Sequence, residues 1–450
     1  MGNYFDMMEF DIGTQIPLEC GGELEILQLL GDGGQGIVYK AIYLSQEYAL
    51  KWYKLEYLKD LETKGILDKF KENIRENIKN GPPSDKFIWP LMLTFDYDGS
   101  FGYLMSLRPE GFYDFTDIFN THDKNGAKVE FNNVKSAVIS ALNIVEAFKT
   151  LHRSGYTYLD LNDGNFFINT QTGDVLVCDN DNVTSTPIFI IGKPGYMAPE
   201  LVRGDSGANS SALTDYHSLA VVLFRLLLRH DPLMGKNYVK SVCISAEKEV
   251  ELYGTNPVFI FDPNDDSNRP VLNIHSNPIN LWPLYPKFVQ DAFIQTFAQG
   301  MKIPGKRLTE YEWIKVLIRL YDDVIICPCG TGMFLCNISK NDRIECPRCG
   351  ISYPYPSQLA VGGYRISVFP RNEVLHCHVH GSEDYKTVIG KTVRSRSDHT
   401  RLGIKNLSDK LWRVKQPHGI TEEIGADKIA VAKPGTEIEF EPGTVGAVES

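Results

Sequence analysis

The sequence has no long hydrophobic run, no excess of basic residues, no internal repeat and no low-complexity tract. The longest apolar stretch, Leu219–Leu228, contains Arg225 and is too short for a membrane span, which needs about 20 residues. Lysines and arginines number 46 against 57 aspartates and glutamates, a net charge of −11. This excludes a general nucleic-acid binder, because such proteins need a basic surface. No basic segment followed by an apolar one opens the chain, so we expect no secretory signal and a cytoplasmic protein.

The composition is that of an ordinary folded protein. Of 450 residues, 43% are apolar and 23% charged, and a chain of this length folds as roughly three domains. The cysteines number nine, and four of them form two close pairs, Cys327 with Cys329 and Cys346 with Cys349. An odd number with tight local pairs indicates a metal site in a reducing compartment rather than a disulfide framework.

A glycine-rich turn lies between two predicted strands near the N-terminus. Its glycines allow backbone N–H groups to approach phosphate oxygens closely. The strand Ile37–Tyr43 follows the turn, whereas a dinucleotide-binding turn opens a helix. A flap over phosphates is therefore predicted, and a plain hairpin is the alternative. The glycines are Gly31, Gly33, Gly34 and Gly36.

Lys51 lies in the middle of an apolar strand predicted over residues 48–53. A buried ammonium group needs a charged partner, so this lysine is a candidate for holding nucleotide phosphates. The carboxylate partner is expected on the helix predicted over residues 66–80, where Glu72 and Glu76 share one face. Of the two, Glu76 is preferred. An exposed strand lysine is the alternative.

Polar residues follow the long amphipathic helix predicted over Asn133–Arg153. The spacing of Asp160 and Asn165 suits a base that accepts a hydroxyl proton and an amide that holds a metal ion. Asp179 ends a later apolar strand, where a carboxylate suits Mg²⁺ bridging phosphates. Each of these residues alone is more often a turn residue or a helix cap.

Taken in order, these motifs resemble a eukaryotic-like serine/threonine protein kinase over about residues 20–325. Further similarities are Ala198-Pro199-Glu200, a helix opening near Asp215, and Arg307, which the family pairs with Glu200. The resemblance implies a bilobal α+β fold, ATP and Mg²⁺ as cofactors, and a protein hydroxyl as substrate. It assigns catalysis to Lys51, Asp160, Asn165 and Asp179. It implies nucleotide contacts from Gly31, Gly33, Gly34, Gly36, Val38, Ala49, Lys51, Glu76, Met105, Ser106, Leu107 and Phe167.

Two departures from the family pattern bear on activity. The family's His-Arg-Asp is Tyr158-Leu159-Asp160 here, which removes the arginine that usually binds a phosphorylated activation loop. The family's Asp-Phe-Gly is Asp179-Asn180-Asp181, which removes the phenylalanine of the active/inactive switch. The alternative to an active kinase is therefore a pseudokinase scaffold that binds nucleotide and recruits partners.

The four clustered cysteines form two knuckles separated by sixteen residues. Four thiolates from two turns give a tetrahedral structural Zn²⁺ site with no open position for catalysis. A zinc ribbon is predicted over residues 326–355, and two unrelated reduced pairs are the alternative. Cys336 is expected in the core. The predicted ligands are Cys327, Cys329, Cys346 and Cys349.

Short alternating strands predict an all-β domain over residues 358–450. It faintly resembles a forkhead-associated sandwich, in which Arg394 and Arg396 would meet a phosphate; a plain docking sandwich is the alternative. The stretch His376–His380 is predicted to place three histidines on one face of a strand. That face is expected to be exposed to solvent, and metal binding is the alternative.

Three segments, GPPSDKFIWPL, CDNDN and FIFDPNDDSNRP, resemble a bacterial subgroup of these kinases. That subgroup is associated with a von Willebrand A-type protein and a metal-dependent phosphatase, and its genes often lie near tellurite-resistance genes. This resemblance implies the two proteins as partners.

Overall fold

The computed structural model describes residues 10–186, 192–241, 244–398 and 400–450. These residues form two compact units. The first comprises residues up to 130, 143–275 and 293–310, and the second comprises residues 131–142, 276–292 and 311–450. Among the described residues, none of the helices combines the length and the apolar composition that a membrane span requires.

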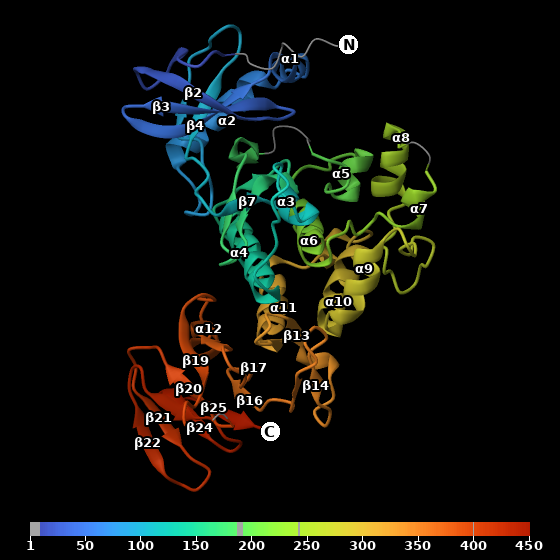
Figure 1. The fold of residues 1–450 in the computed structure, drawn as a ribbon. Helices are drawn as coiled ribbons and strands as arrows, with labels where there is room; N and C mark the ends of the chain where they lie inside the picture. Colours follow the sequence, from blue (N-terminus) through green and yellow to red (C-terminus); the bar gives the residue numbers. More distant parts are fainter. Residues whose placement is uncertain (1–9, 187–191, 242–243, 399) are drawn as a thin grey trace. The chain divides into compact units, whose positions relative to one another are not determined.

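The first unit begins with a six-stranded antiparallel sheet in the order β1-β2-β3-β4-β6-β5, drawn in blue and cyan in Figure 1. Helix α2 packs against it through Phe70 and Ile74, which share a core with Tyr53 and Tyr103. The helix ends at Gly81 (φ 74°), and two prolines follow. The elements are β1 (Gln15–Pro17), β2 (Glu23–Asp32), β3 (Gly36–Tyr43), β4 (Gln46–Tyr53), α1 (Leu55–Thr63), α2 (Leu67–Asn80), β5 (Met92–Leu93) and β6 (Gly102–Met105).

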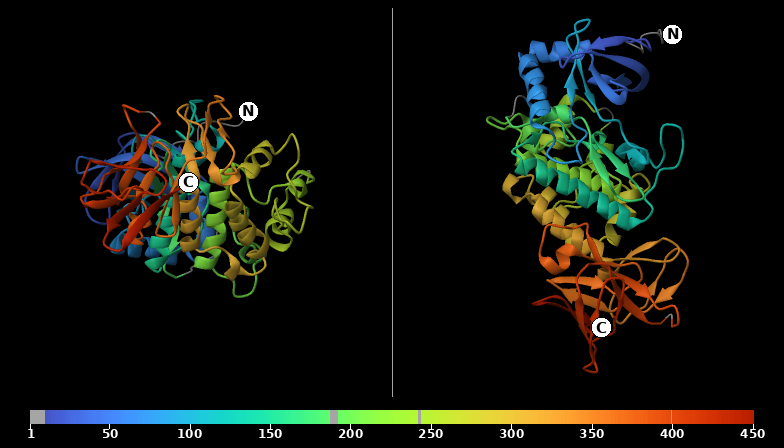
Figure 2. Two further views of the ribbon diagram at one scale, coloured as in Figure 1. Left: turned by 90° about the horizontal axis from the view of Figure 1, so that it is seen from below. Right: turned by 90° about the vertical axis from the view of Figure 1, so that its left-hand side faces the viewer.

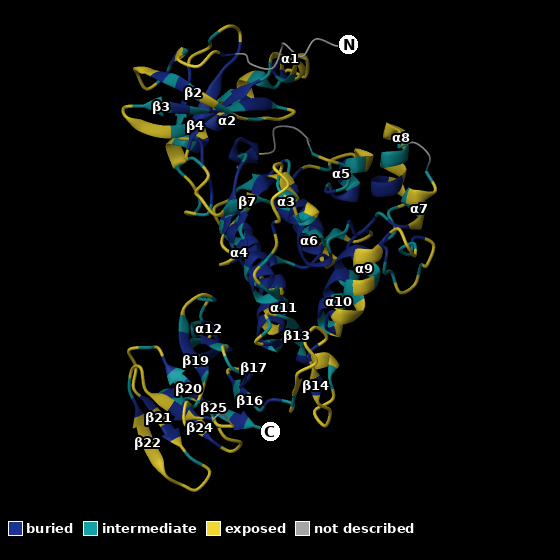
Figure 3. Ribbon diagram, viewed as in Figure 1, coloured by how far each residue is buried: buried dark blue, intermediate teal, exposed yellow. Residues whose placement is uncertain are grey.

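The rest of the first unit is mainly helical, and Figure 2 shows its long helices from two further sides. Helix α6 is buried over nearly its whole length (Figure 3), and at its N-terminus the N–H of Ser211 donates to Oγ1 of Thr214 at 2.8 Å. The helices are α3 (Phe115–Asn120), α4 (Val134–Arg153, whose residues up to 142 belong to the second unit), α5 (Pro199–Arg203), α6 (Ala212–Leu228), α7 (Lys236–Val239) and α8 (Ala246–Glu249). The short strands are β7 (Phe112–Asp114), β8 (Thr157–Tyr158), β9 (Phe166–Asn169), β10 (Val175–Val177) and β11 (Val183–Thr184).

Before the sheets at the end of the chain, the second unit contains the start of α4, helices α9 to α11 and a small ribbon of four short strands. Strand β12 pairs with β13, and β14 pairs with β15, both antiparallel. The helices are α9 (Ser276–Leu281), α10 (Lys287–Ile294, whose last two residues belong to the first unit) and α11 (Glu310–Asp323, whose first residue belongs to the first unit). The strands are β12 (Val324–Ile326), β13 (Gly332–Phe334), β14 (Ile344–Glu345) and β15 (Ser352–Tyr353).

Two antiparallel sheets form the end of the chain, which confirms the predicted all-β region. One has the order β17-β16-β25-β24-β21-β22 and the other β18-β19-β20-β23. Their shared core includes Trp412 and Phe440, whose rings meet edge to face with centroids 4.8 Å apart. The strands are β16 (Gln358–Val361), β17 (Tyr364–Ser367), β18 (Glu373–Leu375), β19 (Val388–Arg394), β20 (Leu402–Asn406), β21 (Trp412–Lys415), β22 (Thr421–Ile424), β23 (Ile429–Val431), β24 (Glu437–Glu441) and β25 (Thr444–Glu449).

The three histidines predicted on one strand face lie instead on the short helix α12 (His376–His380), so that prediction is wrong. The N–H of Leu375 donates to Nδ1 of His378 at 3.0 Å, and Gly381 ends the turn in the left-handed region. His378 is buried, while the rings of His376 and His380 stack with centroids 4.0 Å apart. These local bonds close a helical turn that alternation alone does not reveal.

Candidate active site

The candidate catalytic residues line one open pocket of the first unit, with a volume of about 400 Å³. They come from three separate segments: strand β4, the loop after β8 and the segment after β10. Lys51, Asp160, Asn165 and Asp179 all belong to the lining. The fold thus brings together four residues that span 128 positions of the chain.

The glycine turn closes one side of this pocket. The N–H of Gly33 donates to the carbonyl of Gly36 at 2.9 Å, which closes the turn between β2 and β3. A Cβ atom at Gly36 would lie 2.4 Å from the carbonyl oxygen of Trp52, so only glycine fits there. All four predicted glycines line the pocket: Gly31, Gly33, Gly34 and Gly36.

An apolar cluster adjoins the pocket through Val38, which belongs to both. A largely apolar wall beside a phosphate turn suits the flat face of a nucleobase. Ser106 is exposed and is not part of this cluster. The other residues expected beside the base do share it: Val38, Ala49, Met105, Leu107 and Phe167. Their contact with a nucleotide remains a prediction.

Lys51 is buried and forms two ion pairs. Its Nζ lies 3.0 and 3.1 Å from the carboxylate oxygens of Asp181 and 3.3 Å from Oδ1 of Asp179. Burial alone would lower the pKa of Lys51, but the two carboxylates raise it above its ordinary value. Asp181 is fully buried and also accepts hydrogen bonds from Tyr53 (2.6 Å) and Tyr103 (3.2 Å). The lysine is therefore charged and fixed in place.

The pairing of Lys51 with Glu76 is not found. Glu76 is exposed, and Glu72 is exposed and contacts Arg75. The inward face of α2 carries Asn73 and Asn77, whose amides donate to the carbonyl of Val183 at 2.8 and 2.9 Å. The helix thus faces the segment after Asp179 with neutral amides. The carboxylate that pairs with Lys51 comes instead from Asp181, two residues beyond Asp179.

Asp160 lines the pocket from a loop held by Asn162. The Asn162 amide donates to the Asp160 carbonyl (2.9 Å) and carboxylate (3.2 Å), and its backbone N–H donates to Oδ1 of Asn165 (2.7 Å). Burial raises the pKa of Asp160 to about 6, while the positive charge of Lys193 works in the opposite direction. A base with a pKa near the working pH suits proton acceptance from a hydroxyl.

Asp179 and Asn165 together fit a divalent cation. Asp179 adopts a left-handed conformation (φ 58°), and its side chain is 39% exposed, so the carboxylate is accessible. Asn165 adds an amide oxygen on the same pocket wall, and such hard oxygen ligands suit Mg²⁺. Asn180 is buried, and its amide donates to the carbonyls of Ile88 and Val177, both at 2.8 Å.

Two ion-pair groups brace this loop region. Asp215 accepts hydrogen bonds from the N–H of Tyr158 and from Nε2 of His152, both at 2.9 Å. The predicted pair of Glu200 and Arg307 is confirmed, with two parallel bonds of 2.7 Å and a guanidinium shielded from solvent. These contacts tie the catalytic loop and the segment at residues 198–200 to the buried helices.

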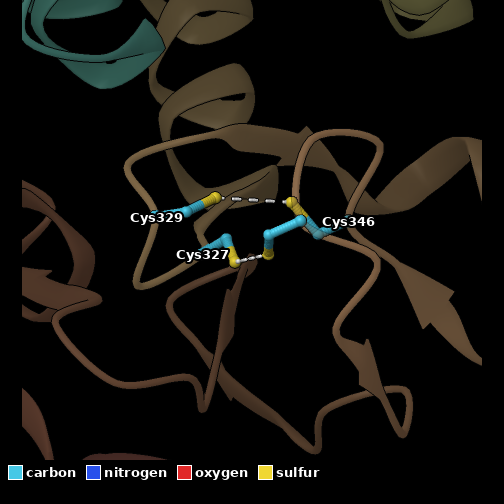
Figure 4. Close-up of side chains that lie close together, drawn as sticks. Cys327, Cys329 and Cys346 are labelled. Atoms are coloured by element: carbon cyan, nitrogen blue, oxygen red, sulfur yellow. Dashed lines mark hydrogen bonds between the residues drawn. The ribbon is translucent and has the colours of Figure 1, made fainter.

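In the second unit, the four predicted zinc ligands come together (Figure 4). The Sγ atoms of Cys327 and Cys349 lie 3.5 Å apart, those of Cys329 and Cys346 lie 3.6 Å apart, and all four lie within 4.8 Å of one another. Thiolates at about 2.3 Å from a tetrahedral Zn²⁺ lie about 3.8 Å from each other. The donor set therefore fits structural zinc. Cys336 is exposed, contrary to expectation.

Sequence reasoning missed two charged residues: Asp181, which pairs with Lys51, and Lys193. The signal for Asp181 was the second aspartate of Asp179-Asn180-Asp181, together with the absence of a carboxylate on the inward face of α2. Lys193 lines the pocket and donates to Oδ1 of Asn162 at 2.8 Å. It lies 33 residues after Asp160, so no local pattern connects the two.

Comparison with known proteins matches this architecture. The chain is 28% identical to the "Probable serine/threonine-protein kinase gdt4" of Dictyostelium discoideum, over 49% of the chain and 13% of that protein. It is 25% identical to the "Probable cell cycle serine/threonine-protein kinase CDC5 homolog" of Encephalitozoon cuniculi, over 61% of the chain and 54% of that protein. It is 26% identical to the "Serine/threonine-protein kinase PrkC" of Bacillus subtilis, over 48% of the chain and 32% of that protein. The chain thus spans less than two thirds of each of these relatives. The sequence model of the family described as "Protein kinase domain" matches residues 24–280, more than half of the chain, and the chain belongs to that family.

Proposed function

We propose that this protein is a serine/threonine protein kinase that transfers the γ-phosphoryl group of ATP to a protein hydroxyl. The observation that carries this proposal is the pocket lined at once by Lys51, Asp160, Asn165 and Asp179. Three of the relatives described above are named serine/threonine-protein kinases, which supports the same substrate class. Catalysis in such a site consists mainly of positioning and charge stabilisation.

Each pocket residue has a role in this proposal. The glycine turn and Lys51 hold the phosphates, and the apolar cluster containing Val38 and Phe167 holds the base. Asp160 accepts the proton of the acceptor hydroxyl. Asn165 and Asp179 would hold Mg²⁺, which neutralises phosphate charge when bound. The pair of Glu200 and Arg307 supports a platform for a protein substrate.

The alternative of a pseudokinase scaffold rests on the two altered triplets. Two observations argue against a scaffold. Asn180, which replaces the switch phenylalanine, is buried, and its amide donates to the backbone carbonyl of Ile88. Lys51 still has a carboxylate partner, Asp181. Purified full-length protein incubated with γ-labelled ATP and a generic protein substrate, with Mg²⁺ or with a chelator, distinguishes the two. A kinase labels the substrate only with Mg²⁺, whereas a scaffold binds nucleotide without labelling it.

The second unit is proposed to dock partners through a zinc ribbon and the β-sandwich, with boundaries at 326–355 and 358–450. The four clustered cysteines, whose Sγ atoms are close enough to bind one tetrahedral ion, support the proposed zinc site. The two antiparallel sheets support the proposed sandwich. A von Willebrand A-type protein and a metal-dependent phosphatase remain the proposed partners, on the sequence resemblance alone. Co-purification of each with the full chain, and its loss when residues 358–450 are deleted, tests this docking role.

A further inference from the structure

The phosphate pocket has more negative than positive groups. Its lining includes Asp32, Asp160 and Asp179 but, among the described residues, only two cationic side chains, Lys51 and Lys193. Asp32 is paired with Lys54 at 2.5 Å. A pocket that must receive a polyanion and stabilise charge on a transferring phosphoryl group needs cations directed at it.

Lys51 cannot supply all of this charge. Its single positive charge is shared by two carboxylates, those of Asp179 and Asp181, and its ammonium also donates to Oε1 of Gln35 at 3.2 Å. The surrounding side chains therefore more than balance it. Besides the Mg²⁺ that Asn165 and Asp179 would hold, a further side-chain cation for the phosphates can come only from the rest of the pocket lining.

Lys193 is placed for this role. Its Nζ donates to the neutral amide oxygen of Asn162 at 2.8 Å, and within the described part of the chain no carboxylate lies within ion-pair distance of it. Asn162 also contacts the carboxylate of Asp160, so the ammonium lies one side chain away from the candidate base. The turn that follows is closed by the N–H groups of Tyr196 and Met197, which donate to the carbonyl of Lys193 at 2.8 and 3.1 Å.

We propose that Lys193 is a catalytic residue whose ammonium contacts the γ-phosphoryl group of ATP during transfer. This inference rests on the proposed kinase function and deepens it. The acceptor hydroxyl oxygen forms a bond to the γ-phosphorus as the bond between that phosphorus and the β,γ-bridging oxygen breaks. The electron pair of the broken bond leaves on ADP, and the hydroxyl proton passes to Asp160. Lys193 stabilises negative charge on the equatorial oxygens and is unchanged at the end.

A purely structural role makes a different prediction. If Lys193 only held Asn162, removing either residue would have the same effect, and removing both would add nothing. If Lys193 contacts phosphate, its loss still lowers the rate when Asn162 is already alanine. A contact between the Lys193 ammonium and the γ-phosphate also raises the affinity for ATP relative to ADP, because only ATP carries that phosphate.

The test compares full-length wild type with Lys193→Met, Lys193→Arg, Asn162→Ala and the Met/Ala double variant. Lys64→Met is the matched control, because Lys64 is exposed at the C-terminal cap of α1. We expect Lys193→Met to lower kcat about 100-fold, as loss of one transition-state donor does, with ADP affinity within about threefold. Lys193→Arg keeps the charge and recovers most of the rate. The double variant is at least about tenfold slower than Asn162→Ala alone.

Binding gives a second measurement that does not need turnover. The ratio of affinities for adenylyl imidodiphosphate and ADP should fall at least about tenfold in Lys193→Met and stay unchanged in Lys64→Met. A Lys193→Met variant with normal kcat and a normal affinity ratio overturns the inference, as does a double variant no slower than Asn162→Ala. If wild type transfers no phosphate, the proposed function fails, and the affinity ratio alone decides the role of Lys193.

Discussion

Lys51 and Asp181 form a buried ion pair whose two partners lie 130 residues apart in the chain. The Lys51 side chain is 5% exposed and that of Asp181 is fully buried. In protein kinases the phosphate-binding lysine pairs with a glutamate of a helix packed against the same sheet. Here that helix is α2, and it presents Asn73 and Asn77 inward. A displacement of α2 would therefore leave the charge pair intact.

Asp181→Asn should impair ATP binding and transfer more than any glutamate change on α2. Removing one partner of a buried pair costs about 3–5 kcal/mol, because the other charge is left uncompensated. We expect a lower melting temperature and a weaker ATP affinity, while the double change Glu72→Gln and Glu76→Gln leaves both unchanged. Calorimetry and nucleotide titration provide the measurements. A loss of ATP affinity in the glutamate variant, with none in Asp181→Asn, would show that a glutamate of α2 is the partner of Lys51.

Activity should not require phosphorylation of the segment after Asp181. Leu159 occupies the position before Asp160 and is buried, so no arginine there awaits a phosphate. Thr184 is buried as well, and its hydroxyl donates to the carbonyl of Thr186 at 2.7 Å. Alanine at Thr184, Ser185 and Thr186 together should keep kcat/KM within about threefold of wild type. A hundredfold fall that acidic replacements reverse would show that another basic residue binds a phosphate in this segment.

One zinc per chain should be found by elemental analysis and lost in Cys346→Ser. Zinc binding at structural sites contributes on the order of 10 kcal/mol to folding, so chelation should unfold the ribbon while the first unit, which has its own core, stays folded. Cys336→Ser is the matched control, because Cys336 is exposed and outside the cluster. Hydrogen exchange in residues 324–355 follows the change. Retention of an ordered ribbon after complete metal removal contradicts this account.

His152 should make stability depend on pH. Burial alone would lower its pKa, but hydrogen bonds to Asp215 and Glu310 raise the pKa to about 9, above the unfolded value of about 6.5. The interaction of protonated His152 with these two carboxylates therefore stabilises the fold fully below pH 6.5. This contribution is lost as the pH rises through 9. The loss is on the order of 3 kcal/mol.

Denaturant unfolding of wild type and His152→Gln across pH 6 to 10 measures this dependence. Glutamine does not titrate in this range, so the difference in unfolding free energy between the two proteins should shrink between pH 6.5 and 9. A difference that stays constant over the whole range would falsify the assignment of the charge to His152.

The sequence was sufficient to predict the features that depend on local pattern. The helix over residues 133–153 and the strands around the glycine turn followed from periodicity, and Asp160 and Asn165 followed from their spacing within one loop. Their meeting in one pocket required the ordered set of kinase motifs. The pair of Glu200 and Arg307, 107 residues apart, came from the family resemblance rather than from any physical pattern.

Tertiary contacts decided the features that the sequence did not predict. Whether Lys51 meets Glu76 or Asp181 depends on which face of α2 turns inward, and two asparagines occupy that face. Lys193 approaches Asn162 only because residues 192–197 lie beside the catalytic loop. The alternation around His376 suggested a strand, but a backbone N–H bonded to the His378 ring closed a helical turn instead.

The central claim is that the pocket transfers phosphate with Asp160 as the base, and Asp160→Asn tests it most directly. Asparagine keeps the size of the side chain but cannot accept the hydroxyl proton, so nucleotide affinity should stay within about threefold of wild type. Single-turnover transfer of labelled γ-phosphate should fall by at least about 100-fold, the scale of general-base catalysis. Transfer by Asp160→Asn at the wild-type rate, with equal nucleotide binding, would contradict the account.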